Sequence, residues 1–549
     1  MKILTQFINT IIQLFNPIDN IKSIKNVKED IFSGITVAVI ALPLALAFGE
    51  ISGLGPFAGI IGAICGGLIG GLFGGSMVSV SGPTAPTSSQ IAVFMGAYLI
   101  GTSSFPDFVA IFSIIFLSGI IMIIAASLNI SKYIQYIPYS VVSGFMCGIG
   151  IIVILSQLKN FFGIKQYNLS DINYDILIVS IPTFIILFLW PLIKKNFNYI
   201  NKIPSPLIAL IIGTSISYLF NLEIPLIGDK MQNTNESHIF NFYIPDFERF
   251  IEFLNPAFSL ALLVIIDSLL TCIIGDNLTG IRHTSNKETF GQGLANMLSG
   301  LLGGTPTATA TMFTVSNIKS GASSSLSSIV YALTLLAILL GFSFIVEMIP
   351  LACIAAILLK VGFDILDYRI LPIMRKLPIS DLFMFITVLF ITVFYDLILA
   401  VGVGVLIAIV QSADSIKRYI KSKHKHQFIS IEEYKLNLKK YKNESINIFR
   451  LEGPIFFASM KLLVKSYTDH QKKDILIIDM NNITRIDLSG TYALEDLIKG
   501  AQINNTLVYV INENSKIDKV LKNVNFIKHI GEKFYFKSKK LLEENLNRD

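Results

Sequence analysis

The sequence predicts an α-helical membrane domain that is followed by a small α/β domain. Hydrophobic residues make up 52% of the 549 residues and charged residues only 15%, whereas soluble domains carry roughly 25% charged residues. Charged residues are scarce up to about residue 415 and frequent after it. We therefore assign 1–28 to an N-terminal cytoplasmic or interfacial segment, 29–415 to the transmembrane domain, 416–440 to a basic linker and 441–549 to the α/β domain.

Long apolar segments divide the membrane domain into spans. A helix needs about 20 apolar residues to cross a bilayer, and clear candidates lie at residues 31–49, 109–128, 176–193, 258–275 and 381–397. Other segments are broken by Gly or Pro, and a total of fourteen spans fits best. With that count, Lys and Arg concentrate in the loops on the side of the N-terminus. Because cytoplasmic loops are enriched in these residues, we expect both termini to be cytoplasmic.

Two matched motifs interrupt the apolar sequence, "SGPTAPTSSQ" at residues 81–90 and "GGTPTATATM" at residues 303–312. In a bilayer, irregular backbone is tolerated only where it is buried in protein or lines a cavity, and Pro fits the first turn of a helix. Each motif therefore predicts an extended piece followed by a short helix that begins at mid-membrane, near Thr84–Thr87 and Thr307–Ala310. Their separation is about half of the membrane domain, which suggests an internal inverted repeat.

Such helix starts predict an anion-binding site. Each exposes unpaired N–H groups and a partial charge of roughly +0.5, and paired broken segments mark the binding site of many transporters. The alternative is that the small residues only allow close helix packing. The presence of two matched motifs favours a binding site.

Asp267 lies near the middle of the span at residues 258–275 and is the strongest candidate for a coupling residue. An ionisable group at that depth is functional by default. Thr271 lies four residues later on the same helix face, and the two oxygen ligands suit Na⁺. An ionised Asp267 would offset the two helix ends, so an anion needs an accompanying Na⁺ or H⁺. The alternative is that Asp267 pairs with a buried partner for structure alone.

Other functional classes receive little support from the sequence. The sequence shows no convincing example of paired catalytic carboxylates, metal-ligand spacing, a Ser-His-Asp set or a phosphate-binding loop. An enzyme is therefore not expected. The four Cys are scattered in apolar segments and predict neither a metal cluster nor a disulfide framework. The basic run "KRYIKSKHKHQ" after the last span fits contact with anionic lipid, and we expect no nucleic-acid partner.

Strand and helix patterns alternate after residue 440. Strands are predicted at 446–457, 475–480 and 507–512, and helices at 490–502 and 516–524.

At these motifs the chain resembles the SulP (sulfate permease) family of anion transporters. The resemblance rests on "VKEDIFSGITVAVIALPLALAFG", on "SGPTAPTS" and on the block from "IDSLLT" to "GGTPTATATM". The tail segment "ITRIDLSGTYALEDL" is similar to a STAS domain. The resemblance implies fourteen membrane segments in two inverted repeats of seven, with half-helices as the third and tenth segments. It also implies core and gate parts that move in an elevator-like cycle, and a homodimer.

Within that family the motifs are most similar to those of the sodium-dependent bicarbonate transporters. This resemblance implies a Na⁺ site at Asp267, Thr271, Thr309 and Thr311. It implies an anion site formed by Phe48, Thr84, Ala85, Thr309, Ala310 and Thr311. Members with similar motifs carry sulfate, dicarboxylates or chloride, often with protons, so these substrates remain alternatives.

The sequence therefore predicts a secondary active transporter in the bacterial cytoplasmic membrane, with Na⁺-coupled bicarbonate uptake as the leading hypothesis. Proton-coupled sulfate or dicarboxylate symport, a passive anion channel of the same fold and a sensor are the alternatives. In related regulatory domains the Ser of "D-x-S-G" is phosphorylated, and Ser489 matches it. The simpler interpretation is that "DLSG" caps a helix.

Overall fold

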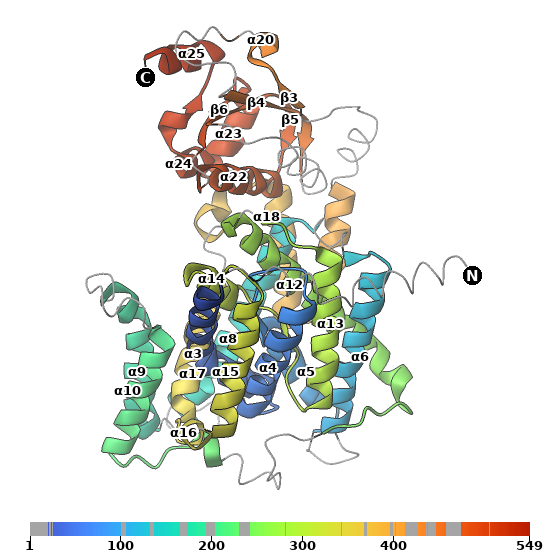
Figure 1. Ribbon diagram of the computed structural model, residues 1–549, viewed down its shortest axis with the longest axis vertical. Coiled ribbons are helices and arrows are strands. Elements are labelled where there is room, and N and C mark those ends of the chain that lie inside the picture. Colours follow the sequence, from blue (N-terminus) through green and yellow to red (C-terminus); the bar gives the residue numbers. More distant parts are fainter. Residues whose placement is uncertain are drawn as a thin grey trace. The chain divides into compact units, whose positions relative to one another are not determined.

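The computed structural model describes most of the chain (Figure 1). The described residues are 20, 24, 26–99, 106–131, 137–164, 173–193, 204–229, 242–279, 281–341, 343–366, 370–395, 399–400, 402–411, 427–434, 436, 446–456, 474–503 and 506–548. They fall into two compact units, one within Met1–Gln135 and Ile149–Leu366 and one within Tyr136–Gly148 and Asp367–Asp549.

Among the described residues before position 412, fourteen helices have nine or more residues. The first seven are α3 (Val27–Ser52), α4 (Pro56–Phe73), α5 (Ala85–Ala97), α6 (Phe108–Ser127), α8 (Tyr139–Phe162), α9 (Tyr174–Ile193) and α10 (Ser205–Leu219). The other seven are α12 (Phe250–Thr279), α13 (Ser285–Leu301), α14 (Thr311–Lys319), α15 (Leu326–Gly341), α17 (Leu351–Ile365), α18 (Ile379–Phe394) and the helix Gly402–Gln411. The five clear candidate spans are confirmed as helices, and six of the described helices are long and apolar enough to cross a bilayer.

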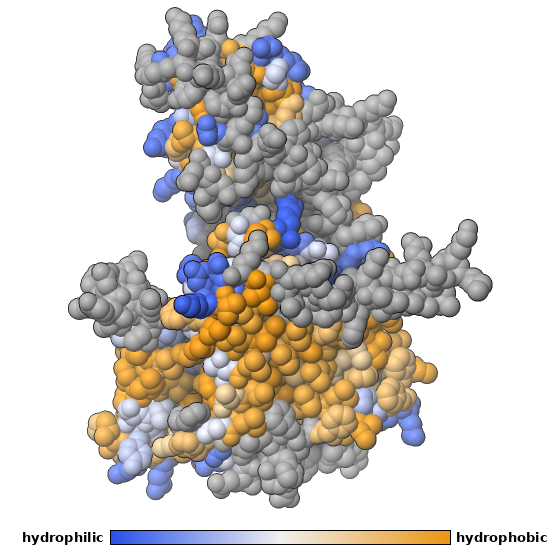
Figure 2. Space-filling view, viewed as in Figure 1, coloured by the Kyte–Doolittle hydropathy of each residue, from blue (hydrophilic) through white to orange (hydrophobic). Residues whose placement is uncertain are grey.

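The helices of the membrane domain carry apolar side chains on their outer surface (Figure 2). The clearest case is α9, where Ile178, Ile181, Ile185 and Phe188 are all exposed. A helix that is hydrophobic on every side is stable in lipid but not in water. The surface therefore agrees with the multi-pass membrane domain that the composition predicts.

Close packing of the first two helices depends on glycine. An added Cβ on Gly59 of α4 would lie 1.9 Å from the carbonyl oxygen of Ala45 on α3, and one on Gly49 would lie 2.4 Å from the carbonyl oxygen of Gly55. Contacts this short are sterically forbidden, so only glycine allows the two backbones to approach.

The third helix of each set of seven follows a two-residue strand. Strand β1 (Ser81–Gly82) precedes α5, and strand β2 (Ala308–Thr309) precedes α14. The two strands pair in antiparallel fashion, with Ser81 opposite Thr309 and Gly82 opposite Ala308. We call the place where β1 and β2 pair the crossing. The chain enters the crossing from opposite directions in the two halves, as an inverted repeat requires.

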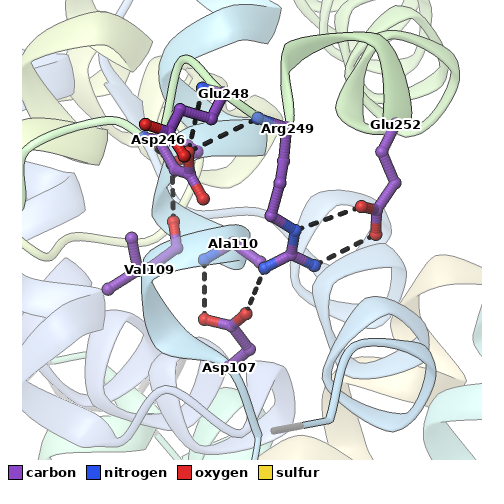
Figure 3. Close-up of polar contacts among 8 residues, drawn as sticks. Asp107, Val109, Ala110, Asp246, Glu248, Arg249 and Glu252 are labelled. Atoms are coloured by element: carbon purple, nitrogen blue, oxygen red, sulfur yellow. Dashed lines mark hydrogen bonds and ion pairs between the residues drawn. The ribbon is translucent and has the colours of Figure 1, made fainter. Parts of the chain in front are cut away.

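A charged cluster anchors the N-terminal end of α12 to α6 (Figure 3). Asp107 caps α6 by accepting from the Ala110 N–H at 3.1 Å, and it also accepts from Arg249 at 2.6 Å. Arg249 in turn donates two hydrogen bonds to Glu252, at 3.0 and 3.1 Å. Glu252 and Asp107 both raise the pKa of the Arg249 guanidinium, which stays cationic. Because Arg249 is 39% exposed, the cluster contributes orientation more than stability.

The second unit contains a five-stranded sheet of order β3-β4-β5-β6-β7. The strands are β3 (Gln427–Ile429), β4 (Ile446–Ile455), β5 (Ile475–Ile486), β6 (Leu507–Ile511) and β7 (Tyr535–Phe536). The helices that follow or connect these strands are α20 (Ile431–Tyr434), α22 (Leu488–Ile503), α23 (Ser515–Asn523), α24 (Phe526–Ile530) and α25 (Lys539–Arg548). The three predicted strands and two predicted helices are present. The pairs from β4 to β7 are parallel and β3 is antiparallel to β4.

The sheet begins earlier than the sequence suggests. Strand β3 lies inside residues 416–440, which the sequence analysis assigns to the linker, because Gln427–Ile429 pair with Ile448–Arg450 of β4. Three residues at a sheet edge give too short a pattern to predict a strand. Residues 412–426, which hold most of the basic run, lie outside the described residues.

We predict that Gly59→Ala lowers the thermal unfolding midpoint of the detergent-solubilised protein. The added methyl group would force α3 and α4 apart, and overpacking of this kind costs about 1–3 kcal/mol. Gly96→Ala on α5 is the matched control, because a Cβ there meets nothing within 4 Å. An unchanged midpoint for Gly59→Ala would contradict the close approach of the two helices.

Candidate functional site

The first broken segment ends in a capped helix that begins where the sequence predicts. Thr84 is the N-cap residue of α5, with extended backbone, and Pro86 lies in the first turn. The Thr84 N–H donates to the Thr87 hydroxyl at 3.2 Å. The Thr84 hydroxyl donates to Oδ2 of Asp267 at 2.7 Å. The start of α5 is therefore tied directly to the carboxylate on α12.

The second helix begins at the very end of the predicted range. Helix α14 starts at Thr311 with Ala310 as its N-cap. Unlike Pro86, Pro306 does not lie in the first turn, because the residues after it are held extended. The Thr309 N–H donates to the Ser268 hydroxyl at 3.1 Å, and the Ala310 N–H donates to the Val80 carbonyl at 3.0 Å.

Asp267 and Thr271 lie one turn apart on α12 and each meets one of the two helix starts. Thr84 contacts Asp267, and the Thr271 hydroxyl lies 2.7 Å from the hydroxyl of Thr311, the first residue of α14. Asp267 is partly exposed and Thr311 is exposed. Within the described part of the chain, Lys, Arg and His form no salt bridge with Asp267. The Thr84 hydroxyl therefore contacts a carboxylate that lacks a described cationic partner, and two further hydroxyls meet one helical turn away.

The Thr309 hydroxyl is held by two side chains of α13. It donates to Oε1 of Glu288 at 2.6 Å and accepts from the Gln292 amide at 3.0 Å. Its side chain is fully buried. The Thr309 backbone N–H meets α12 at the Ser268 hydroxyl, so Thr309 links α12 to α13.

The predicted anion-facing residues Phe48, Ala85 and Ala310 are buried apolar side chains. Ala85 and Ala310 lie at the starts of α5 and α14. A cavity of about 770 Å³ in the first unit is lined in part by Leu44 of α3 and Met312 of α14. The charged residues of its lining are Lys319, Lys360 and Asp364, and Asp364 pairs with Lys360.

Ser489 in the second unit is buried and engaged. Its side chain is 3% exposed, and its hydroxyl oxygen accepts from the Tyr139 N–H at 2.8 Å. Asp487 accepts from the Gly490 N–H at 2.7 Å. Asp487 therefore makes the cap contact at the start of α22, while Ser489 contacts the start of α8.

The sequence analysis missed Glu288 and Gln292. Both are fully buried and both contact Thr309. A signal was available, since Glu288, Gln292 and Asn296 recur at intervals of four residues and so form one polar stripe on a helix.

The chain combines a fourteen-helix membrane domain, two opposed half-helices and a following α/β domain. This combination is typical of anion transporters of the SulP class, and the family comparison agrees. Residues 27–388 match the sulfate permease family and residues 437–541 match the STAS domain. The chain belongs to this family. It is a multi-pass membrane transporter for anions and not an enzyme.

One relative and two solved structures show the likeness in more detail. The bicarbonate transporter BicA of Picosynechococcus sp. is 34% identical over 531 residues, which is 92% of each chain. The solved transmembrane domain of a cyanobacterium bicarbonate transporter BicA covers 69% of this chain and 98% of its own, with 35% identity and a TM-score of 0.62. The overall structure of SLC26A9 shares the fold over 98% of this chain and 94% of its own, with 17% identity and a TM-score of 0.63.

On the hypothesis that Asp267 binds Na⁺, we predict that Thr84→Val raises the Na⁺ concentration for half-maximal uptake roughly tenfold. The change removes the hydroxyl that orients Asp267, and a hydrogen bond to a charged group contributes about 1.5–3 kcal/mol. Thr84→Ser retains the hydroxyl and should behave like the wild type. A loss in the Ser variant together with wild-type behaviour of the Val variant would show that the methyl group, not the hydrogen bond, matters.

Proposed function

We propose that this protein is a secondary active transporter that takes up bicarbonate, or a closely related inorganic anion, together with Na⁺. The two helix starts supply the anion site, and Asp267 with Thr271 and Thr311 supplies the cation site. Transport would follow an elevator-like alternating-access cycle.

The observation that carries the proposal is the 2.7 Å hydrogen bond from Thr84 to Asp267. It joins the N-cap of a half-helix, where an anion is stabilised, to the carboxylate that attracts a cation. Two helix starts provide about +1 in total and an ionised Asp267 provides −1. An anion at the helix starts is therefore favoured only when a cation offsets Asp267, which is the physical basis of coupling.

Bicarbonate is the leading choice of anion because a relative with 92% coverage of both chains is named a bicarbonate transporter. Sodium is the leading choice of cation because the oxygen atoms of Asp267, Thr271 and Thr311 suit a hard cation. The sulfate permease description of the family favours a second candidate, H⁺-coupled sulfate or dicarboxylate symport. In that case a proton on Asp267 would take the place of Na⁺. A passive anion channel of the same fold would need neither.

The cellular setting is part of the same proposal. We expect the protein in the bacterial cytoplasmic membrane, with both termini on the cytoplasmic side, as a homodimer in contact with lipid. The excess of Lys and Arg on the N-terminal side of the predicted spans supports this orientation.

We predict that Asp267→Asn abolishes Na⁺-stimulated uptake in proteoliposomes while the protein remains folded. Asn keeps the size of the side chain and an acceptor for Thr84 but removes the charge that attracts Na⁺. The measurement is uptake of labelled bicarbonate, sulfate and succinate with and without an inward Na⁺ gradient, and then with a proton gradient.

The control is the wild-type protein in the same vesicles, with thermal unfolding as a check on the fold. Full Na⁺-dependent transport by Asp267→Asn would remove the coupling role. Uptake by the wild type that follows the anion gradient alone would identify a channel.

We also propose Ser489 as a regulatory phosphorylation site. A phosphate would remove the hydrogen bond with the Tyr139 N–H and place up to two negative charges beside Asp487. Because Ser489 is buried, a kinase would act only after this contact opens.

We predict that Ser489→Glu lowers the uptake rate, whereas Ser489→Ala leaves a smaller defect. The added carboxylate cannot occupy the space that the hydroxyl shares with the Tyr139 backbone. Mass spectrometry of native protein should detect the phosphate, and its absence under every growth condition would end the idea.

A further inference from the structure

Glu288 is a buried carboxylate that none of the assigned roles uses. It lies in the first turn of α13 and is 2% exposed. Its Oε2 accepts from the N–H groups of Gly75 and Ser76 at 2.8 and 3.1 Å. Its Oε1 accepts from Gln292 at 2.9 Å and from the Thr309 hydroxyl at 2.6 Å.

The four contacts suit an ionised carboxylate. The N–H groups of Gly75 and Ser76 can only donate, so Oε2 acts purely as an acceptor in this arrangement. Hydrogen bonds to the charged form stabilise it, and a negative charge in the first turn of a helix is favoured by the helix dipole. In the described part of the chain, no Lys, Arg or His forms a salt bridge with Glu288.

Gln292 extends these contacts to both crossing strands. Its amide nitrogen lies 2.5 Å from the Ser81 hydroxyl on β1 and 3.0 Å from the Thr309 hydroxyl on β2. Ser81 and Thr309 are paired directly across the two strands. One side chain on α13 therefore bridges the two halves of the repeat at the crossing itself.

We propose that Glu288, acting through Gln292 and Thr309, is the positioning residue that sets the spacing between the two helix starts and Asp267. It fixes the side chain of Thr309 toward α13, which leaves the Thr309 N–H on the hydroxyl of Ser268, next to Asp267. Ala310 and Thr311 follow directly and open α14. The inference rests on the proposed function, because it concerns the same site.

The position of Glu288 gives a clear physical consequence. The substitution Glu288→Gln would remove the charge. The Gln amide would then point its N–H donors at one or more of the existing donors, and the two paired strands would shift. The helix starts would then hold their anion and cation less well. Because Glu288 touches neither solute, loss of its charge should lower the affinity for the anion and the cation more than it lowers the maximal uptake rate.

The test is a double-mutant cycle with Glu288→Gln, Thr309→Val and the double variant in full-length protein in proteoliposomes. We expect Glu288→Gln to raise the half-saturation concentrations of bicarbonate and Na⁺ about tenfold, with less than a threefold change in maximal rate. If Glu288 acts through Thr309, the double variant should resemble Thr309→Val alone. Additive effects or unchanged half-saturation in folded Glu288→Gln would overturn the proposal.

Asp30→Asn is the matched control. Asp30 is a buried first-turn carboxylate on α3 that accepts from the N–H groups of Ser323 and Ser324 and from the Ser324 hydroxyl. It does not contact β1 or β2, so its loss should lower the unfolding midpoint without changing half-saturation. An equal change in half-saturation in both variants would show that the effect is general destabilisation and would reject the positioning role.

Two further points keep the test decisive. If Glu288→Gln fails to fold, Gln292→Met removes the bridge to Ser81 while leaving the carboxylate on Thr309, and unchanged half-saturation in that variant would reject the proposal. If wild-type uptake proves independent of Na⁺, the coupling proposal fails alone. The cycle on bicarbonate half-saturation still decides the role of Glu288.

Discussion

The antiparallel contact between two broken membrane segments is the constraint on which the rest of the site depends. Ser81–Gly82 and Ala308–Thr309 are short of partners within their own segments, so each strand satisfies the backbone of the other. This pairing brings two helix starts together beside α12. The same contact thus satisfies backbone N–H and C=O groups within the membrane and creates a site for negative charge.

Two helices complete the site from different directions. Helix α12 carries Asp267 and Thr271 to the two helix starts, where Thr84 and Thr311 meet them. Helix α13 reaches the crossing from another side through Gln292. Charge and geometry therefore converge on one point of the fold.

The sequence predicts much of this arrangement because its main signals are local. Apolar length predicts the spans, and the Pro and Thr pattern at residues 81–90 predicts the start of α5. Pro306 misleads because long-range bonds to Ser268 and Val80 keep the chain extended for four more residues. Glu288 escapes notice because its donors Gly75 and Ser76 lie more than two hundred positions away. The edge strands β3 and β7 are too short to leave a periodic pattern.

The central claim is that the anion and the cation stabilise each other at the crossing. The most direct measurement is equilibrium binding of radioactive Na⁺ to the purified protein with and without bicarbonate. Linkage requires that each solute raise the affinity of the other by the same factor, and the account predicts reciprocal increases of about tenfold. Sodium binding that is absent, or that bicarbonate leaves unchanged, would contradict it.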